Sequence, residues 1–220
     1  MATTPVGYSP VVLRNVPLFS GLDDLELEKL SKVSGRKRVE RGAFIVRSGE
    51  STDSLYFLLV GRAKVTNVDE DGREIILAWL GPGEFFGEMG LIDGSPRSAN
   101  VVAAEACELL FLSKEAFQRC LQDNFQVAQK LMKTLVMRLR EADRKIESLA
   151  LLDVYGRVAR LLLDMSEVAD GRRVIRKKMS KQDMAKMIGA SREMVSKVMR
   201  DLELSGYICY EGDLLVIPGA

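Results

Sequence analysis

Between Gly83 and Ala99 the chain places a carboxylate, a guanidinium and a hydroxyl close together, at Glu88, Arg97 and Ser98. Gly87 allows the backbone to approach a bound group closely, and Glu88 offers a carboxylate to a sugar hydroxyl. Arg97 can pair with a phosphate through its planar guanidinium, and Ser98 adds a hydroxyl donor. These residue types in this order indicate a site for a phosphate and a sugar.

A second group of polar side chains follows Ser191, where a short helix is expected. Arg192 can donate to guanine, Glu193 can accept from cytosine N4, and Lys197 can reach a second guanine or a phosphate. Glu193 is informative, because a carboxylate near a phosphate backbone is repelled unless it meets a base donor. An intrahelical pair between Glu193 and Lys197 is the alternative.

The charge of the chain is segregated along the sequence. Lysine and arginine number 32 against 31 aspartates and glutamates, a net charge of +1. Residues 171–200 hold ten basic and two acidic side chains, a net +8, which leaves −7 for the rest of the chain. The basic ones are Arg172, Arg173, Arg176, Lys177, Lys178, Lys181, Lys186, Arg192, Lys197 and Arg200. A solvated basic face is the alternative, but the expected base-reading helix in the same window favours a nucleic-acid partner.

The composition excludes several classes of protein. The absence of histidine removes Ser-His and Cys-His catalysis and His-ligated metal sites. Cys107, Cys120 and Cys209 are far apart, which argues against a disulfide framework, a zinc finger or an iron–sulfur centre. We therefore expect no catalytic residue and no metal, and we interpret the cysteines as small buried residues in a reducing cytoplasm. No apolar run is long enough to span a membrane, so no membrane partner is expected.

The first region that must position these residues has the pattern of short apolar runs and glycines that is typical of a β-protein. From Arg36 to Leu112, short apolar runs alternate with glycines, and Asp71-Gly72 lies between two strand-like runs. An Asp-Gly pair in that setting is a strong hairpin signal. Several short strands at this spacing predict a sandwich or jelly roll, assigned to residues 13–121.

The second region is an expected long helix over residues 122–152. Its apolar residues repeat with steps of three and four, and we call them the seam: Phe125, Ala128, Met132, Leu135, Leu139, Ala142, Ile146 and Leu149. A 4-3 repeat of this kind is typical of a coiled coil. It predicts a homodimer through this helix, and a long helix lying on its own barrel is the alternative.

The third region, residues 153–220, is predicted to be a separate small domain. A helix is expected over 153–170, ending near Asp170-Gly171, where glycine supplies a helix stop. Ser180 and Ser191 then suit the N-caps of two short helices joined by a turn at Gly189-Ala190. A β-hairpin wing is expected after Gly206, so the pattern indicates a winged helix-turn-helix.

At these motifs the chain resembles a cyclic AMP receptor protein/FNR-family transcription regulator, from about Leu13 to Ile217. The Gly83–Ala99 block resembles the family's phosphate-binding cassette, and we call it the cassette. Residues 149–157 resemble the hinge of the family, and residues 191–197 resemble its recognition helix. The resemblance implies an α+β fold class: an N-terminal β jelly roll that binds a cyclic nucleotide, a long coiled-coil dimerisation helix and a C-terminal winged helix-turn-helix domain.

The resemblance also implies roles for individual residues. Gly87 and Glu88 would take the ribose hydroxyl, and Arg97 and Ser98 the cyclic phosphate. The implied ligand-binding residues are Phe86, Gly87, Glu88, Met89, Arg97, Ser98, Ala142 and Asp143. The implied DNA-binding residues are Ser180, Lys181, Gln182, Ser191, Arg192, Glu193, Ser196 and Lys197.

The chain departs from the family pattern where cyclic AMP receptors contact adenine. Their serine on a barrel strand and Thr-Ser pair on the dimer helix match Ala78, Ala142 and Asp143 here. Asp143 could receive a guanine edge or an arginine of a partner subunit. The wing carries Glu211 and Asp213 in place of basic residues or histidine, which is expected to weaken its contacts with the DNA backbone.

Together with these observations, the resemblance implies a cytoplasmic, homodimeric regulator, not an enzyme, that binds palindromic double-stranded DNA with TGTGA-like half-sites. A cyclic nucleotide, with cyclic AMP favoured, is expected to control its DNA affinity. Cyclic GMP, cyclic di-GMP and a regulator that needs no ligand stay as alternatives, and an enzyme on a jelly-roll scaffold is the hypothesis from another class. RNA polymerase stays open as a partner, although the loop at 166–171 is shorter than the surface that cyclic AMP receptors use for it.

Overall fold

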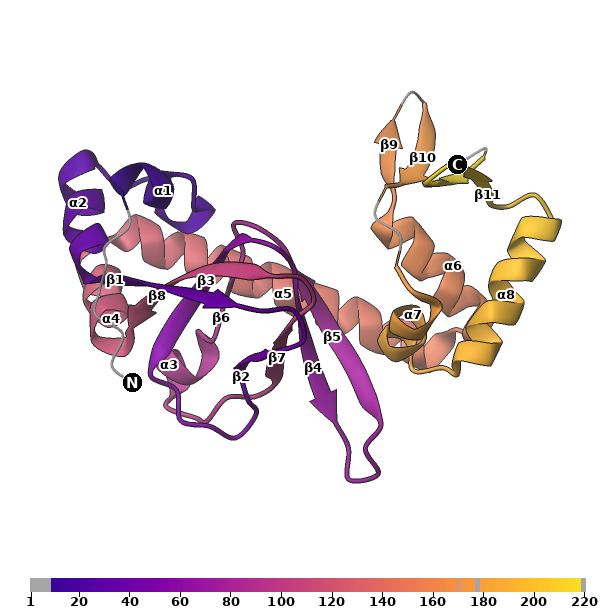
Figure 1. Ribbon diagram of the computed structural model, residues 1–220, viewed down its shortest axis with the longest axis horizontal. Helices are drawn as coiled ribbons and strands as arrows, with labels where there is room; N and C mark the ends of the chain where they lie inside the picture. The colour runs from indigo at the N-terminus through magenta and orange to yellow at the C-terminus, as the bar shows by residue number, and fades with distance from the viewer. Residues whose placement is uncertain (1–8, 170, 177–178, 219–220) are drawn as a thin grey trace. The chain divides into compact units, whose positions relative to one another are not determined.

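The computed structural model describes residues 9–169, 171–176 and 179–218. The chain divides into two compact units, one that runs to Met137 and one that starts at Arg138. Figure 1 shows that the first unit is rich in β-strands and that the second contains short helices and a small sheet. Each unit is described by itself below.

Three short helical segments open the described part of the first unit: α1 (Pro10–Arg14), η1 (Pro17–Phe19) and α2 (Asp24–Val33). Asp23 and Glu26 form a capping box, in which each backbone N–H donates to the carboxylate of the other at 2.8 Å. This pair explains why α2 begins at Asp24. Leu27 and Leu30 on α2 are buried in the core of the unit.

The strands of the first unit form two antiparallel sheets that face each other. They are β1 (Ser34–Val39), β2 (Phe44–Val46), β3 (Ser54–Val60), β4 (Ala63–Val68), β5 (Glu74–Leu80), β6 (Phe85–Phe86), β7 (Asn100–Ala103) and β8 (Cys107–Ser113). One sheet has the order β1-β8-β3-β6 and the other the order β2-β7-β4-β5. The side chains of Phe57, Leu58 and Leu109 are fully buried, so the predicted jelly roll is confirmed.

The predicted hairpin at Asp71-Gly72 joins β4 to β5. Gly72 has a φ of +79°, a backbone conformation that glycine adopts without a steric penalty. The strands pair from Ala63 with Leu80 to Val68 with Glu74, with one bulge between Val65 and Thr66.

Three further helices follow, α3 (Met89–Asp93), α4 (Lys114–Asp123) and α5 (Phe125–Leu151). The expected helix over 122–152 therefore starts with the last two residues of α4. Asn124 interrupts it, because its φ of −133° and ψ of 92° are not helical. The 27 residues of α5 give it a length of about 40 Å.

The seam stays exposed along α5. Phe125 is 73 % exposed, Leu139 62 % and Ile146 64 %, although all three are large and apolar. The helix instead packs on the sandwich through Val127 and Leu131, which are buried in its core. Most of the seam is therefore exposed on α5.

Among the residues described, the second unit contains the end of α5, three further helices and one sheet. Its elements are α6 (Val154–Met165), β9 (Glu167–Ala169), β10 (Arg172–Ile175), α7 (Lys181–Ile188), α8 (Arg192–Leu204), β11 (Cys209–Glu211) and β12 (Leu214–Ile217). The strands have the order β11-β12-β10-β9. Val158, Val195 and Val216 are almost completely buried. The winged helix-turn-helix is confirmed.

The prediction of a helix over 153–170 was wrong after Met165, since α6 ends there and β9 follows. Ser166 already has an extended backbone, with a φ of −83° and a ψ of 147°. The strand pairing that favours this conformation joins Val168 to Arg173, so Asp170-Gly171 lies in sequence between two paired strands. Gly171, with a φ of +73°, precedes β10, so it does not stop a helix. Asp170 lies outside the described residues.

The cysteines differ from one another in burial. Cys107 and Cys120 are buried as predicted, whereas Cys209 at the start of the wing is only half-buried. Burial raises the pKa of the Cys120 thiol to about 11 and also raises the pKa of Cys107. Among the helices described, none combines the length and the apolar character that a membrane crossing needs.

Candidate functional site

The two helices of the helix-turn-helix start at the predicted serine caps. The backbone N–H of Asp183 donates to Ser180 Oγ at 3.0 Å, and that of Met194 donates to Ser191 Oγ at 3.1 Å. Between the helices, Gly189 has a φ of +63° and ends α7 in the left-handed conformation. These local signals were readable from the sequence, and all of them are confirmed.

The predicted DNA-binding residues lie on the surface of α7 and α8. Ser196 is half-buried, and the others, namely Ser180, Lys181, Gln182, Ser191, Arg192, Glu193 and Lys197, are exposed. The inward positions Val195, Val198, Met199 and Leu202 are buried, so they orient the polar face of α8 outward. In the part of the chain that the structure describes, no ion pair joins Glu193 to Lys197. Of the predicted basic window, Lys177 and Lys178 lie outside the described residues.

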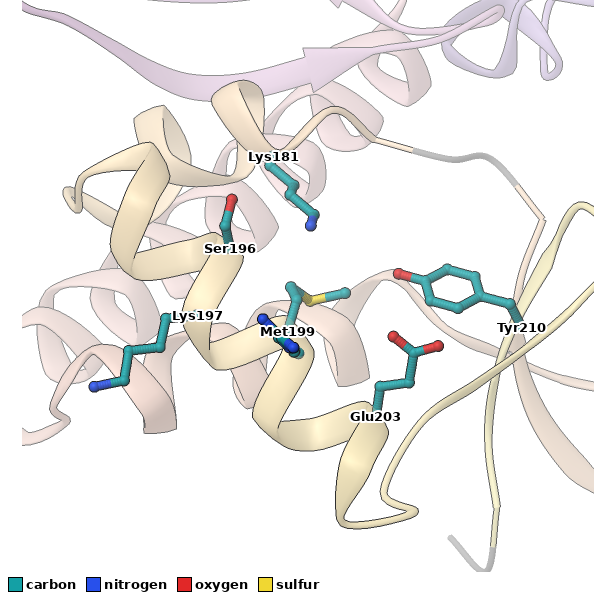
Figure 2. Close-up of a pocket in the computed structure, with 7 residues that line it drawn as sticks. Lys181, Ser196, Lys197, Met199, Glu203 and Tyr210 are labelled. Atoms are coloured by element: carbon teal, nitrogen blue, oxygen red, sulfur yellow. The ribbon is translucent and has the colours of Figure 1, made fainter.

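A pocket of about 560 Å³ lies between α8 and the wing (Figure 2). Its lining combines three of the predicted DNA-binding residues, Lys181, Ser196 and Lys197, with Arg200 of the predicted basic window and with Met199, Glu203 and Tyr210. Figure 2 shows the Tyr210 side chain reaching from β11 toward α8. The positive charge of Arg200 was readable from the sequence. Tyr210 was not identified, because only the fold of the wing places it in the lining of the same pocket.

The acidic wing is partly neutralised within the second unit. Arg172 on β10 donates to Glu211 on β11 at 2.8 Å, and both side chains are about half exposed. The expected repulsion between the wing and a phosphate backbone is therefore reduced at Glu211.

In the first unit, the backbone of Arg97 is held at two points. Its N–H donates to the carbonyl of Glu50, and its own carbonyl accepts from the N–H of Gly49, both at 2.9 Å. The two bonds fix the end of the cassette against the loop that precedes β3.

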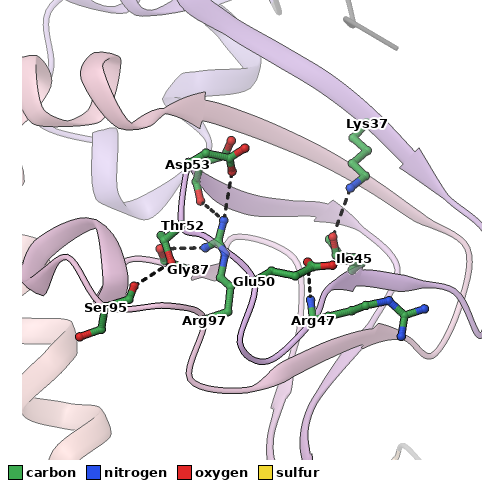
Figure 3. A network of polar contacts seen from close by, with 10 residues as sticks. Lys37, Ile45, Arg47, Glu50, Thr52, Asp53, Gly87, Ser95 and Arg97 are labelled. Atoms are coloured by element: carbon green, nitrogen blue, oxygen red, sulfur yellow. Dashed lines mark hydrogen bonds and ion pairs between the residues drawn. The ribbon is translucent and has the colours of Figure 1, made fainter.

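The guanidinium of Arg97 is buried, with only 6 % of the residue exposed. It donates from Nη1 to the Gly87 carbonyl at 3.0 Å and from Nη2 to the Ser54 carbonyl at 2.8 Å. The Asp53 carboxylate lies 3.6 Å from Nη2 (Figure 3). The structure therefore brings Gly87 and Arg97 together, as the resemblance implied. The roles of Asp53 and Ser54 were missed, because only the pairing of β3 with β6 places them there.

At two positions of the cassette, neighbouring atoms lie so close to the backbone that a glycine is required. Gly87 has a φ of +87°, and a Cβ added to it would lie 2.0 Å from Nη1 of Arg97. A Cβ on Gly90 would lie 2.2 Å from the Ser95 carbonyl and 2.4 Å from Thr52 Oγ1. Any side chain at these positions would push the arginine or the loop away.

The other predicted cassette residues differ in exposure. Glu88 is 3 % exposed and directly precedes α3. Phe86 is buried, and its ring stacks on Tyr56 with 5.4 Å between the centroids. Met89 is 54 % exposed, and the Ser98 hydroxyl lies 3.7 Å from its sulfur. The cassette thus combines buried anchors with side chains that solvent can reach.

Lys37 and Tyr56 were not predicted, and Lys37 and Arg97 both lie over the Tyr56 ring. The Arg97 guanidinium lies 5.7 Å and the Lys37 ammonium 5.3 Å from the centre of the Tyr56 ring. Burial lowers the pKa of Lys37, whose ammonium donates to the Ile45 carbonyl at 3.2 Å. Burial raises the pKa of Tyr56, and the Asp53 carboxylate acts in the same direction, so the phenol stays neutral at neutral pH.

Ala142 and Asp143 are exposed on α5 and belong to the second unit. They are therefore described separately from the cassette. Neither side chain is covered within its own unit, so both are accessible to a ligand or to another chain.

Two family models match the chain, one in each unit. Residues 36–124 match the cyclic nucleotide-binding domain, and residues 156–218 match the Crp-like helix-turn-helix domain. The first match includes the whole cassette, and the second includes all the predicted residues on α7 and α8.

Several characterised proteins are similar over most of the chain. The cAMP-activated global transcriptional regulator Vfr of Pseudomonas aeruginosa is 36 % identical over 203 residues, which cover 88 % of this chain and 94 % of Vfr. The cAMP-activated global transcriptional regulator CRP of Pasteurella multocida is 35 % identical over 182 residues, covering 80 % of this chain and 86 % of CRP. The solved structure of the c-di-GMP responsive global regulator CLP of Xanthomonas campestris has a TM-score of 0.72 and 30 % identity, covering 90 % of this chain and 100 % of CLP.

The geometry and these similarities agree. A cassette that holds a buried arginine and a capped helix-turn-helix with a basic surface occur in one chain, each within the segment that its family model matches. The chain belongs to the cyclic AMP receptor protein/FNR family of DNA-binding transcription regulators.

Proposed function

We propose that this protein is a homodimeric transcription regulator whose affinity for palindromic DNA is controlled by a cyclic nucleotide bound at the cassette, with cyclic AMP as the favoured effector. The proposal contains no catalytic step and places the protein in the cytoplasm, where it meets DNA. The observation that carries it is the buried Arg97 guanidinium, which is held in place by the carbonyls of Gly87 and Ser54.

The arrangement of Arg97 supports phosphate binding. A guanidinium has five N–H donors in a rigid plane, and two of its nitrogens already donate to carbonyls of the cassette and β3. The remaining donors suit the oxygens of a cyclic phosphate, and Glu88 beside Gly87 suits a ribose hydroxyl. Preorganisation of this kind reduces the entropy lost on binding.

The identity of the base rests on the relatives and on α5. Vfr and CRP are named as cAMP-activated, which supports cyclic AMP. The second candidate is cyclic di-GMP or cyclic GMP, supported by the similarity to CLP and by the exposed Asp143 carboxylate, which can accept from a guanine edge.

The exposed seam supports the homodimer. Leu139, Ile146 and Leu149 would remain in water in a single chain, whereas a second copy of α5 would bury them at coiled-coil spacing. A two-fold dimer would present two copies of α8 to successive major grooves about 34 Å apart. Arg192 and Glu193 match the family's readers of TGTGA, and Lys197 stands where the family has arginine.

The variant Arg97→Gln tests the effector site. It should weaken binding of cyclic AMP by about 1.5–3 kcal/mol, or about ten- to hundredfold in Kd, because a charge-assisted bond to the phosphate is lost. Isothermal titration calorimetry measures this on protein whose fold is checked by circular dichroism. Arg47→Gln is the control, since Arg47 is exposed in the same unit and its guanidinium lies over Phe44. Equal affinity of the Arg97 variant and the wild type would disprove phosphate binding at Arg97.

Leu139→Glu tests the dimer. A carboxylate inside the seam should destabilise the dimer by about 3 kcal/mol or more, because it would be buried without a partner. Sedimentation equilibrium measures the monomer–dimer constant. Leu25→Glu is the matched control, since Leu25 is 60 % exposed on α2 and lies outside the seam. A Leu139→Glu protein that remains dimeric at the wild-type concentration would contradict assembly through α5.

Glu193→Gln tests base recognition. We expect discrimination at one C·G pair of each half-site to fall by about 1–3 kcal/mol, because the carboxylate that accepts from cytosine N4 is removed. Competition binding with single-base variants of a TGTGA palindrome measures it. Lys181→Gln should instead weaken binding to all sequences and lower the salt slope by about 0.9 for each phosphate that the lysine neutralises. If Glu193→Gln weakened every sequence equally, the assigned role of Glu193 would be refuted.

A further inference from the structure

Arg157 on α6 makes a contact that neither the cassette nor the DNA-facing residues explain. Its Nη1 donates to the carbonyl of Ile188 at 2.7 Å, across 31 positions in the sequence. Its Nε is buried and has no hydrogen-bond partner among the described residues. A half-buried guanidinium with one unused donor is costly to keep, since an apolar side chain would leave no donor unpaired.

The carbonyl that Arg157 contacts lies at the C-terminal end of α7, directly before the turn of the helix-turn-helix. Ile188 is the last residue of α7, where backbone carbonyls lack partners within the helix and carry partial negative charge. Gly189 follows in the left-handed conformation, and the Ala190 N–H donates back to the Ala185 carbonyl at 3.0 Å. Ser191, the cap of α8, is only three residues beyond Ile188. The bond from Arg157 therefore ties α6 to the turn that starts the recognition helix.

Two side chains from other helices lie beside the exposed turn. A Cβ on Gly189 would lie 3.8 Å from Arg157 Nη1 and 3.7 Å from Leu149 Cδ2 at the end of α5. Within the second unit, α5 and α6 thus both reach the α7–α8 turn. Arg157 is the one of these two side chains that holds the turn by a directed, charge-assisted bond.

We propose that Arg157 is a positioning residue for DNA recognition: its bond to Ile188 sets the angle at which α8 presents Arg192 and Glu193 to the bases. Base contacts require the side chains to be held within about 0.5 Å of their productive positions. A small rotation of the turn would tilt the whole of α8 and displace Arg192 and Glu193 from the base edges. Phosphate contacts would change less, because long, flexible side chains can follow the displacement. The proposal uses the DNA binding of the family and does not depend on which effector occupies the cassette.

The variant Arg157→Met, compared with Arg157→Lys and with Arg160→Met, tests the proposal. Arg160 is a matched control, since it lies on the same helix, is about half exposed and pairs with Asp164 at 3.3 Å. Fluorescence anisotropy on the full-length protein measures affinity for a TGTGA palindrome and for a copy changed at the pair that Glu193 faces. Each titration is done at several salt concentrations and well below the melting temperature.

We expect Arg157→Met to lower the affinity for the correct palindrome by about tenfold or more. The ratio between the affinities for the correct palindrome and for the changed copy should therefore decrease. The salt slope and the affinity for cyclic AMP should match the wild type. Arg157→Lys should recover part of the discrimination, because its ammonium can still donate to the Ile188 carbonyl. Arg160→Met should leave all four quantities unchanged.

Two results would overturn the proposal. An unchanged ratio between correct and changed DNA would assign Arg157 to stability alone. A salt slope that falls by about 0.9 in Arg157→Met would make Arg157 a direct phosphate ligand instead. If Arg157→Met does not fold, Arg157→Ala decides, since it also removes every side-chain donor, and a wild-type ratio with this variant also overturns the proposal.

Discussion

A charged guanidinium is stable inside a β-sandwich only where hydrogen-bond acceptors surround it, and this constraint shapes the cassette. Arg97 meets it with the carbonyls of Gly87 and Ser54. Gly87 must then lack a side chain, since a Cβ would lie 2.0 Å from Nη1. The strand pairing of β3 with β6 brings the two acceptors together. The same interaction that closes the loop therefore holds a cation ready for an anionic ligand.

The DNA-reading half follows a different physical rule, because it depends on charge and on helix termini rather than on burial. Most of its described basic side chains are exposed around two capped helices, and the buried apolar residues of α8 orient the polar face of that helix outward. The net charge of +1 for the whole chain conceals this basic region, since the net +8 of residues 171–200 is offset by a net −7 in the rest of the chain. Helix α5 is the covalent link between the halves. An effector can act through it only by binding the available arrangements of the two halves unequally.

The sequence predicted those features that depend on neighbouring residues. Asp71-Gly72, the caps Ser180 and Ser191, and the inward face of α8 were all readable, because turn and capping chemistry acts over a few positions. It did not show that Ser54 and Asp53 hold Arg97, or that Tyr210 and Arg200 line one pocket, since the packing of separate elements brings these residues together. The strand at Glu167–Ala169 was mistaken for helix because Asp170-Gly171, which was interpreted as a helix stop, separates two paired strands instead.

The central claim is that nucleotide binding and DNA binding are coupled within one protein, and thermodynamic linkage tests it most directly. The Kd for a TGTGA palindrome is measured with and without cyclic AMP, and the Kd for cyclic AMP is measured with and without that DNA, in one buffer. We predict that both affinities increase by the same factor, because coupling between two binding sites is reciprocal. Parallel titrations with cyclic GMP and cyclic di-GMP identify the base. A DNA affinity that none of the three nucleotides changes would contradict the claim.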